Sequence, residues 1–192
     1  MNNTEFITLP LFPLGTTLYP SGLINLKIFE VRYLDMIKTC VRENTPFGIV
    51  TLDHGSEVRT PHEKISFARV GTFANITHFD AIQPCLYFIQ CQGGARFTIR
   101  GCERKKNGLW VADVEVMEDD EAMPIPPELK IAADTLNKVI KSMAKKGLTE
   151  QQMPFMPPYL LGDCGWVANR WCEILPLSAG QREHLLGLEN PR

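Results

Sequence analysis

The first fifty residues alternate between short apolar runs and turn signals, which predicts two strands, a helix and a third strand. The apolar run over residues 6–14 contains Pro10 and Pro13, and each proline removes a backbone donor. We therefore expect this strand to be bent or to have an open edge at the prolines. After a Tyr-Pro-Ser-Gly turn the chain resumes as a second strand over residues 23–29.

A helix is predicted next, because apolar residues recur at intervals of three and four between Glu30 and Asn44. Glu30 suits the positive end of this helix, and the Asn-Thr-Pro sequence that begins at Asn44 ends it. Residues 47–50 then form a third apolar strand. The residues that share the apolar face of the helix are Tyr33, Leu34, Ile37, Cys40 and Val41.

Between residues 65 and 118 the hydrophobic period is two, as expected of strands. The Asn107-Gly108 pair near the end of this region is a typical signal of a tight hairpin. The predicted strands cover residues 70–79, 86–91, 96–100 and 110–116.

The last two of these predicted strands contain charged residues. Arg96 and Arg100 are predicted to face away from the apolar residues between them. Pairing of the two strands would place the arginines near Asp113 and Glu115. We expect a surface charge pattern worth about 0.2–1 kcal/mol per pair, rather than an anion-binding site.

An acidic, proline-rich run over residues 117–127 is the clearest boundary in the chain, because such a sequence has little to bury. We therefore divide the chain into a β subdomain over residues 1–121 and an α-helical subdomain over residues 122–192. A long amphipathic helix is predicted to follow the prolines and to end near Lys145.

Two further helices are predicted after it. Asp163 can cap the first, and Ser178 and Gln181 have the spacing of a capping box before the second.

Several motifs follow one another in a fixed order along the chain. They are Leu9-Pro10-Leu11-Phe12-Pro13-Leu14-Gly15, Ile28-Phe29-Glu30-Val31-Arg32-Tyr33, Phe47-Gly48-Ile49-Val50, Val70-Gly71-Thr72, Arg96-Phe97-Thr98-Ile99 and Leu175-Pro176-Leu177-Ser178. This order closely resembles the substrate-recognition domain at the N-terminus of Lon proteases. The resemblance implies an α+β fold in which a small, partly closed β-barrel of the PUA-like (pseudouridine-synthase-associated) type is followed by an α-helical subdomain.

In Lon proteases the domain precedes an ATP-driven unfolding module and a peptidase, and the 192 residues leave room for neither. We therefore expect a stand-alone form of the domain. The resemblance implies that it binds unfolded or flexible polypeptides or protein partners.

Composition and charge limit the classes of partner that the protein can bind. A hydrophobic fraction of 44% and a charged fraction of 22% are ordinary for a globular protein. A net charge of -2 and a pI near 6.1 give no long-range attraction to nucleic acid or to anionic lipid. The sequence has no apolar run of the ~20 residues that a membrane span needs, and its first residues lack a secretory pattern. We expect a cytoplasmic protein with no nucleic-acid or membrane partner, and the oligomeric state is left open.

Motifs of catalysis and metal binding are missing from the sequence. It has no phosphate-binding Gly-x-x-x-x-Gly-Lys-Ser/Thr loop, no Gly-x-Ser-x-Gly elbow and no His-Glu-x-x-His pair. The six cysteines include no Cys-x-x-Cys pair, and several lie within apolar patterns, as buried reduced thiols do. We therefore predict a non-catalytic protein without catalytic residues, metal site or cofactor.

The candidate residues for polypeptide binding are Met153, Phe155, Met156 and Tyr159. These large apolar side chains follow neither a helical nor a strand period, and nearby prolines keep the backbone extended. They would line an apolar groove, with sheet edges or loops adding main-chain hydrogen bonds. The competing interpretation is that they are buried between the barrel and the helices, since apolar residues in a connection usually belong to the core.

Two other functions stay open at this stage. A small-ligand-binding or enzymatic pocket between the barrel and the helices would contain converging polar groups. RNA binding is the weaker alternative, because basic residues cluster only at Arg104, Lys105 and Lys106.

Overall fold

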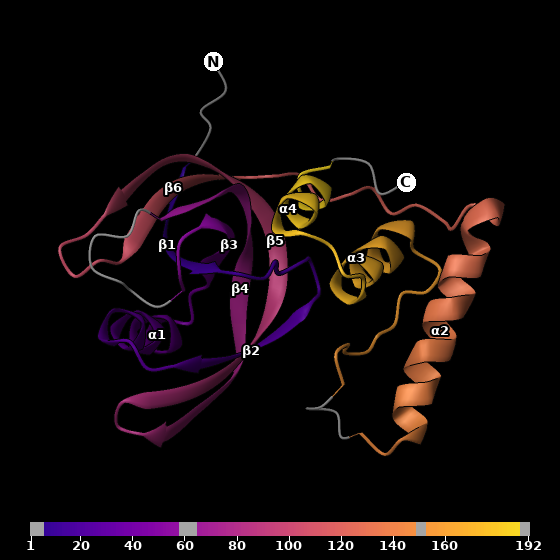
Figure 1. Ribbon diagram of the computed structural model, residues 1–192, viewed down its shortest axis with the longest axis horizontal. Coiled ribbons are helices and arrows are strands. Elements are labelled where there is room, and N and C mark those ends of the chain that lie inside the picture. The colour runs from indigo at the N-terminus through magenta and orange to yellow at the C-terminus, as the bar shows by residue number, and fades with distance from the viewer. Residues whose placement is uncertain (1–5, 58–64, 149–152, 189–192) are drawn as a thin grey trace.

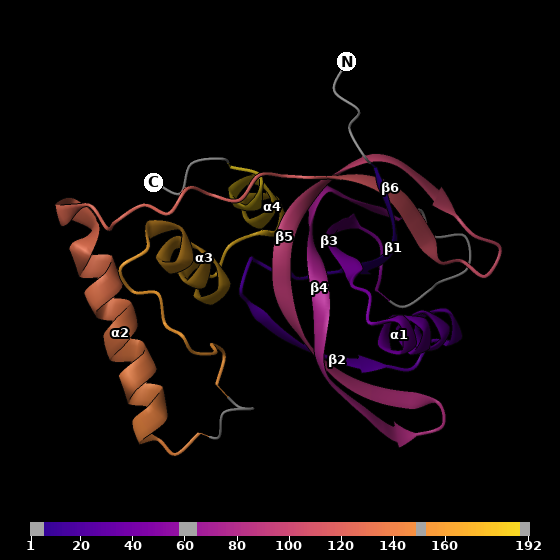
Figure 2. The ribbon, with the colours of Figure 1, turned by 180° about the vertical axis from the view of Figure 1, so that it is seen from behind.

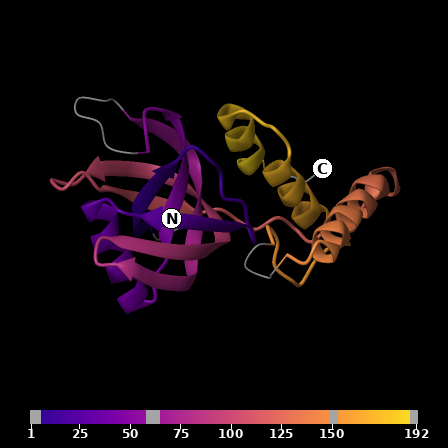
Figure 3. The same cartoon turned by 60° about the horizontal axis from the view of Figure 1, so that its bottom comes forward.

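The computed structural model describes residues 6–57, 65–148 and 153–188. The barrel part contains β1 (Ile7–Leu14), β2 (Leu23–Ile28), α1 (Val31–Glu43), β3 (Phe47–His54), β4 (Ser66–Gln83), β5 (Leu86–Arg104) and β6 (Trp110–Val116). The helical part contains the 3-10 helix η1 (Pro127–Leu129), α2 (Lys130–Lys145), α3 (Cys164–Ile174) and α4 (Ala179–Leu186). The helices α2, α3 and α4 lie to one side of the strands and α1 (Figures 1 and 3).

The strands form a curled sheet that is close to a barrel. Its order is β2-β5-β4-β3-β1-β6, and β6 also pairs with β5, so five strands are joined in a ring. β2 and β6 lie along the same edge of β5, because β2 pairs with its residues 87–92 and β6 with its residues 97–104. The predicted α+β class, with a PUA-like small barrel followed by helices, is confirmed (Figures 1 and 2).

β1 changes its partner at Leu11. Residues from Ile7 to Leu11 pair antiparallel with β6, and those from Leu11 to Leu14 pair parallel with β3. Pro10 and Pro13 therefore lie in halves of β1 that have a strand neighbour on one side only. The missing backbone donor of a proline is tolerated at such an edge, as the sequence predicted.

β5 is one long strand where the sequence predicted separate strands over residues 86–91 and 96–100. The Gly93-Gly94 pair lies inside it, at a place where the turn before β2 touches its backbone. Ser21 N donates to Gly93 O (2.8 Å), and a Cβ on Gly93 would lie 2.1 Å from the carbonyl oxygen of Tyr19. Glycine is needed here for close approach, so the prediction of a break was wrong.

Three clusters of buried apolar side chains hold the elements together. The first lies between α1 and the sheet, and its members include Ile37, Phe47 and Ile89. The second fills the ring and includes Leu11, Phe97 and Val114. The third joins α2 to α3 and includes Leu136, Phe155 and Trp166. Each cluster therefore belongs either to the barrel or to the helices.

The predicted helix ends are confirmed. The Asp163 carboxylate accepts a hydrogen bond from the backbone N–H of Trp166 (2.7 Å) at the start of α3. Ser178 and Gln181 form the reciprocal bonds of a capping box at the start of α4. These local bonds satisfy donors that a helix leaves free in its first turn.

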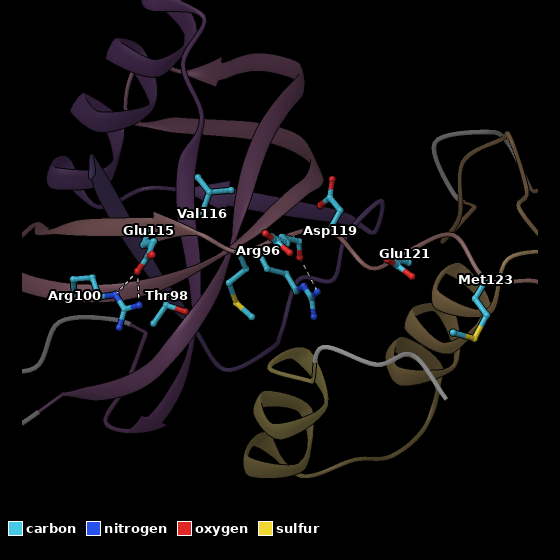
Figure 4. A pocket seen from close by; sticks show the side chains of 10 residues that line it. Arg96, Thr98, Arg100, Glu115, Val116, Asp119, Glu121 and Met123 are labelled. Atoms are coloured by element: carbon cyan, nitrogen blue, oxygen red, sulfur yellow. Dashed lines mark hydrogen bonds and ion pairs between the residues drawn. The ribbon is translucent and has the colours of Figure 1, made fainter. Parts of the chain in front are cut away.

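Arg100 pairs with Glu115 on the surface as predicted, through a 2.6 Å bond from Nε (Figure 4). The prediction for Arg96 was wrong, because its side chain is buried. The residues after β6 and the end of α4 fold back over this position. Strand periodicity cannot reveal such a long-range cover.

The Arg96 guanidinium joins three segments that are distant in the sequence. Nη2 donates to the carboxylate of Asp120 (2.7 Å) and to the carbonyl of Glu118 (3.2 Å). Nη1 donates to the carbonyls of Leu186 (3.1 Å) and Leu188 (2.5 Å). A strand of the barrel thereby holds both the connection to the helices and the end of α4. The division into residues 1–121 and 122–192 stays our proposal for the boundary within this connection.

Replacing Arg96 by Met should lower the free energy of unfolding by about 2–4 kcal/mol, because a partly buried carboxylate and several carbonyls lose their donor. The matched control is Arg100→Met on the same strand, which should cost less than about 1 kcal/mol because its ion pair is exposed. Urea denaturation measures both. Equal effects of the two substitutions would contradict the claim that the hydrogen bonds of Arg96 stabilise the fold more than the exposed ion pair of Arg100 does.

Candidate functional site

A groove of about 650 Å³ lies between β1 and α1, and we call it the β1–α1 groove. One wall consists of residues 7–10 of β1, and the opposite wall consists of α1 and the Thr45-Pro46 connection that leads into β3. Asn107 and Leu109, from the hairpin between β5 and β6, line one end. Its volume lies within the roughly 300–1,000 Å³ that is typical of ligand sites.

The strand edge inside this groove has no neighbour. Residues 7–10 pair with β6 on one side, and pairing with β3 begins only at Leu11. Thr45 and Pro46 directly precede β3, but they do not continue it beside β1. They follow the end of α1 and line the opposite wall. Within the described chain no strand fills this side of residues 7–10. An extended peptide can form main-chain hydrogen bonds with such an edge, except at Pro10, which has no N–H.

The groove combines an apolar floor with a polar rim. Leu9, Met36 and Phe73 are buried along it, whereas Ile7 at its mouth is 41% exposed. Asp35, Thr39 and Glu43 contribute polar side chains from α1. Floors of this kind bind apolar side chains, and polar groups at the rim stay hydrated.

Arg32 fixes the hairpin end of the groove. Its Nη1 donates to the carbonyl of Gly108 (2.8 Å), and its Nη2 forms an ion pair with Glu30 (3.1 Å). The guanidinium also lies 4.4 Å from the ring centroid of Tyr33. Because Arg32 is buried and bonded to the hairpin, it ties α1 to the hairpin end of the groove.

The four residues predicted from the sequence as a binding surface differ in how far they are exposed. Phe155 is 2% exposed and packs in the helical core, and Met153 is partly buried against the same cluster. Met156 and Tyr159 are 39% and 37% exposed, and Leu160 continues this apolar stretch. Phe155 is thus buried, Met153 is partly buried, and Met156 and Tyr159 are accessible.

The β1–α1 groove was missed by this prediction. The signal that points to it is the pair of prolines within β1, which predicted an open edge without saying what lies beside it. The side chains that line the groove beside that edge come from several separate segments, including Phe73, Asn107 and Leu109. The sequence pattern therefore did not reveal the groove.

A second cavity, of about 240 Å³, lies between the barrel and the helices, and we call it the inter-subdomain cavity. Tyr19 and the neighbouring threonines line it from the barrel, and Cys172, Glu173 and Arg182 line it from α3 and α4. The hydroxyl of Tyr19 donates to the carbonyl of Arg182 (3.0 Å). Polar groups from both parts of the chain therefore meet here.

Burial dominates the electrostatics of this cavity. It raises the pKa of the Glu173 carboxyl to about 7, although the neighbouring Arg170 guanidinium pulls the value down. Arg170 is 1% exposed, and its Nη2 donates to Glu173 (2.8 Å) and to the carbonyl of Pro20 (2.8 Å). Burial likewise raises the pKa of Tyr19, with a smaller contribution from the adjacent Cys172 thiol.

A third groove, of about 490 Å³, follows the acidic connection after β6 (Figure 4). Arg96 and Arg100 both line it, but each is already paired, with Asp120 and Glu115 respectively. The remaining charges along it are acidic, from Glu118, Asp119 and Glu121. This charged groove is therefore less suited to binding an apolar peptide segment than the β1–α1 groove is.

Within residues 6–57, 65–148 and 153–188, no group of three or more His, Cys, Asp or Glu side chains is arranged to hold a metal ion. None of the helices described there has the length and hydrophobicity to cross a membrane. None of the six cysteines, which all lie within the described residues, forms a disulfide.

Residues 8–191 match the family described as the ATP-dependent protease La (LON) substrate-binding domain. The chain belongs to this family. The confirmed membership covers the whole described fold, and the family is that of a substrate-binding domain, not of a catalytic module. It supports a non-catalytic role in substrate recognition, with proteins or polypeptides as the class of substrate.

Solved structures agree with this assignment. A Lon N-terminal domain protein from Xanthomonas campestris is 31% identical, with a TM-score of 0.72 over 97% of this chain and 93% of its own. The N-terminal domain of the Mycobacterium avium complex Lon protease is 15% identical, with a TM-score of 0.56 over 96% of this chain and 92% of its own, and it shares the fold. No curated protein shows significant similarity to the chain.

The raised pKa of Glu173 makes stability depend on pH. Between pH 4.5, the ordinary value of the carboxyl, and about 7, the folded chain keeps a proton that the unfolded chain releases. This group therefore stabilises the fold at low pH, and its contribution falls as the pH rises through that window, by on the order of 1–3 kcal/mol.

Urea denaturation at pH 5 and at pH 8 measures this effect, and Glu173→Gln should remove it because the amide does not titrate. Glu128→Gln, on the first turn of the helical part, is the control and should keep the pH dependence of the natural chain. An identical pH dependence in Glu173→Gln would show that Glu173 does not titrate in this range.

Proposed function

We propose that this LON substrate-binding domain binds flexible or unfolded polypeptide segments in the β1–α1 groove. Family membership supports a recognition role, and the groove supplies the physical means. The observation that carries the proposal is the coincidence of an unpaired strand edge at residues 7–10 with an apolar floor at Leu9, Met36 and Phe73.

A bound segment would lie extended beside residues 7–10. Its backbone would pair with the free edge of β1, and alternate side chains would point toward the floor. Main-chain pairing does not read sequence, so such a site accepts many segments that are apolar and unfolded. Ordering a flexible chain costs conformational entropy, and we therefore expect dissociation constants in the micromolar range or weaker.

A second candidate contact is the exposed apolar stretch at Met156, Tyr159 and Leu160. We keep it as a proposal because its side chains are large and accessible, and Met adapts its shape to different partners. Phe155 and Met153 would support this surface from below, since both pack into the helical core.

The proposed clients are proteins or polypeptides, with no role for nucleic acid or membrane. The mildly acidic composition supports this, because phosphate polymers are bound by basic surfaces. We also propose that the protein works in the cytoplasm, where unfolded clients of this kind arise, and that it does not cleave them itself.

The substitution Thr39→Arg tests the groove, because Thr39 is exposed and lines its α1 wall. A long charged side chain there should obstruct the apolar floor and weaken binding of a fluorescent, permanently unfolded casein at least about fivefold. The matched control is Thr135→Arg on α2. Both threonines are exposed and donate to the carbonyl four residues earlier, at 3.1 Å and 2.7 Å. Fluorescence anisotropy measures the affinities.

The same assay separates the two candidate surfaces. If Thr39→Arg binds casein as the natural chain does, and the double substitution Met156→Ser and Tyr159→Ser abolishes binding, the helical stretch is the site and the groove proposal fails. Peptides N-methylated at alternate residues test the main-chain contacts, because methylation removes the donors that would pair with β1. Binding that is unchanged by methylation on either alternate set would contradict strand addition.

A further inference from the structure

The inter-subdomain cavity has a polar end and an apolar wall. Thr16 and Arg182 form the polar end, where the turn after β1 meets α4. Leu23, Ile24 and Phe155 are among the apolar side chains along its wall. Its volume of about 240 Å³ lies below the roughly 300–1,000 Å³ of sites for drug-sized ligands, so an occupant must be small.

Arg182 has donors that the described chain leaves unused. Its Nη1 donates to the hydroxyl oxygen of Thr16 (3.2 Å), but its Nε is buried and has no hydrogen-bond partner. No carboxylate of the described residues forms an ion pair with its guanidinium. A buried N–H without an acceptor costs about 1–3 kcal/mol, and native proteins rarely retain one without a reason.

Glu173 is the one carboxylate among the described residues that lines the cavity, and it is already paired. Its Oε1 accepts from Arg170 (2.8 Å), whose own Nε is also buried and without a partner. Among the described residues the cavity is thus lined by the Arg182 guanidinium and by the Glu173 carboxylate, whose ion-pair partner Arg170 is not part of the lining. Arg182 has no carboxylate counterion within residues 6–57, 65–148 and 153–188, and an unpaired guanidinium favours an anionic ligand.

We propose that the inter-subdomain cavity binds a small carboxylic acid with an apolar body. The carboxylate accepts from Nη2 of Arg182, because a charged donor forms a short, strong hydrogen bond with a carboxylate. Thr16 adds a second bond, because its oxygen accepts from Arg182 while its own hydrogen is free to donate. The apolar body packs against Leu23, Ile24 and Phe155.

Such a ligand would also connect the two parts of the chain. Thr16 and Leu23 belong to the barrel, whereas Phe155 and Arg182 belong to the helical part. A molecule that contacts both parts binds the folded arrangement and not the unfolded chain, so it raises the thermal midpoint as its concentration increases. This site is independent of the β1–α1 groove, and failure of one proposal leaves the other in place.

Isothermal titration calorimetry with hexanoate tests the proposal, and hexanamide is the control ligand because it keeps the apolar body and lacks the charge. We expect saturable binding of hexanoate and affinity for hexanamide at least about tenfold weaker. Arg182→Met should weaken hexanoate binding by about the same factor, whereas Arg42→Met, an exposed arginine of α1, should leave it unchanged.

The comparison of the two ligands on the natural chain needs no substitution, so it decides the question even if Arg182→Met does not fold. Thr16→Val, which keeps the shape and removes the hydroxyl, should weaken hexanoate binding less than Arg182→Met does. Equal affinity for hexanoate and hexanamide, unchanged binding in a folded Arg182→Met, or no saturable binding up to about 20 mM would each overturn the proposal.

Discussion

The change of partner along β1 is the constraint on which the rest of the structure depends. One strand of eight residues pairs with β6 in its first half and with β3 in its second, and so it closes the ring of strands. Because neither half of β1 has neighbours on both sides, closure leaves open edges within a nearly closed barrel. Pro10 and Pro13 fit these half-paired positions, and α1 packs beside them. The same strand therefore supplies the core with Leu9 and Leu11 and supplies the groove with its free edge.

The barrel and the helices are joined mainly by polar bonds. The apolar clusters each lie within one part, whereas Arg96, Arg170 and Arg182 all bond across the division. Their acceptors are mostly carbonyls, at Leu186, Leu188 and Pro20. Hydrogen bonds from a charged donor are directional and strong, so a few of them fix how the two parts meet. A connection of this kind also creates cavities, because polar contacts leave more space between the parts than interdigitating apolar side chains do.

The features that could be predicted from the sequence are those that local chemistry decides. Asp163 and Ser178 cap helices whose first turns lie within three residues of them, and Asn107-Gly108 forms a tight turn on its own. The family resemblance then implied a small barrel followed by helices, which periodicity alone cannot give. Periodicity failed at Gly93, where the approach of a distant turn determines the residue.

The candidate sites were harder to predict because their walls come from distant segments. Arg96 has the pattern of a surface residue until the end of α4 covers it. Phe155 and Tyr159 are four residues apart in one proline-broken connection, yet the first is buried and the second exposed. In the same way, the unused donor of Arg182 depends on which acceptors the fold brings near it. The burial of these side chains and the pairing of their polar atoms depend on tertiary packing, which the composition of a segment does not reveal.

Hydrogen–deuterium exchange of the natural chain, with and without saturating unfolded casein, tests most directly whether the open edge of β1 receives the client. The account predicts that binding slows exchange in the peptic fragments that cover residues 6–12, because alternate amides of this segment point to the open edge and not to β6. Exchange in β2, an edge strand outside the groove, should stay the same. Saturated binding with unchanged exchange over residues 6–12 would contradict the account, and slowed exchange confined to residues 153–160 would place the client on the helical part instead.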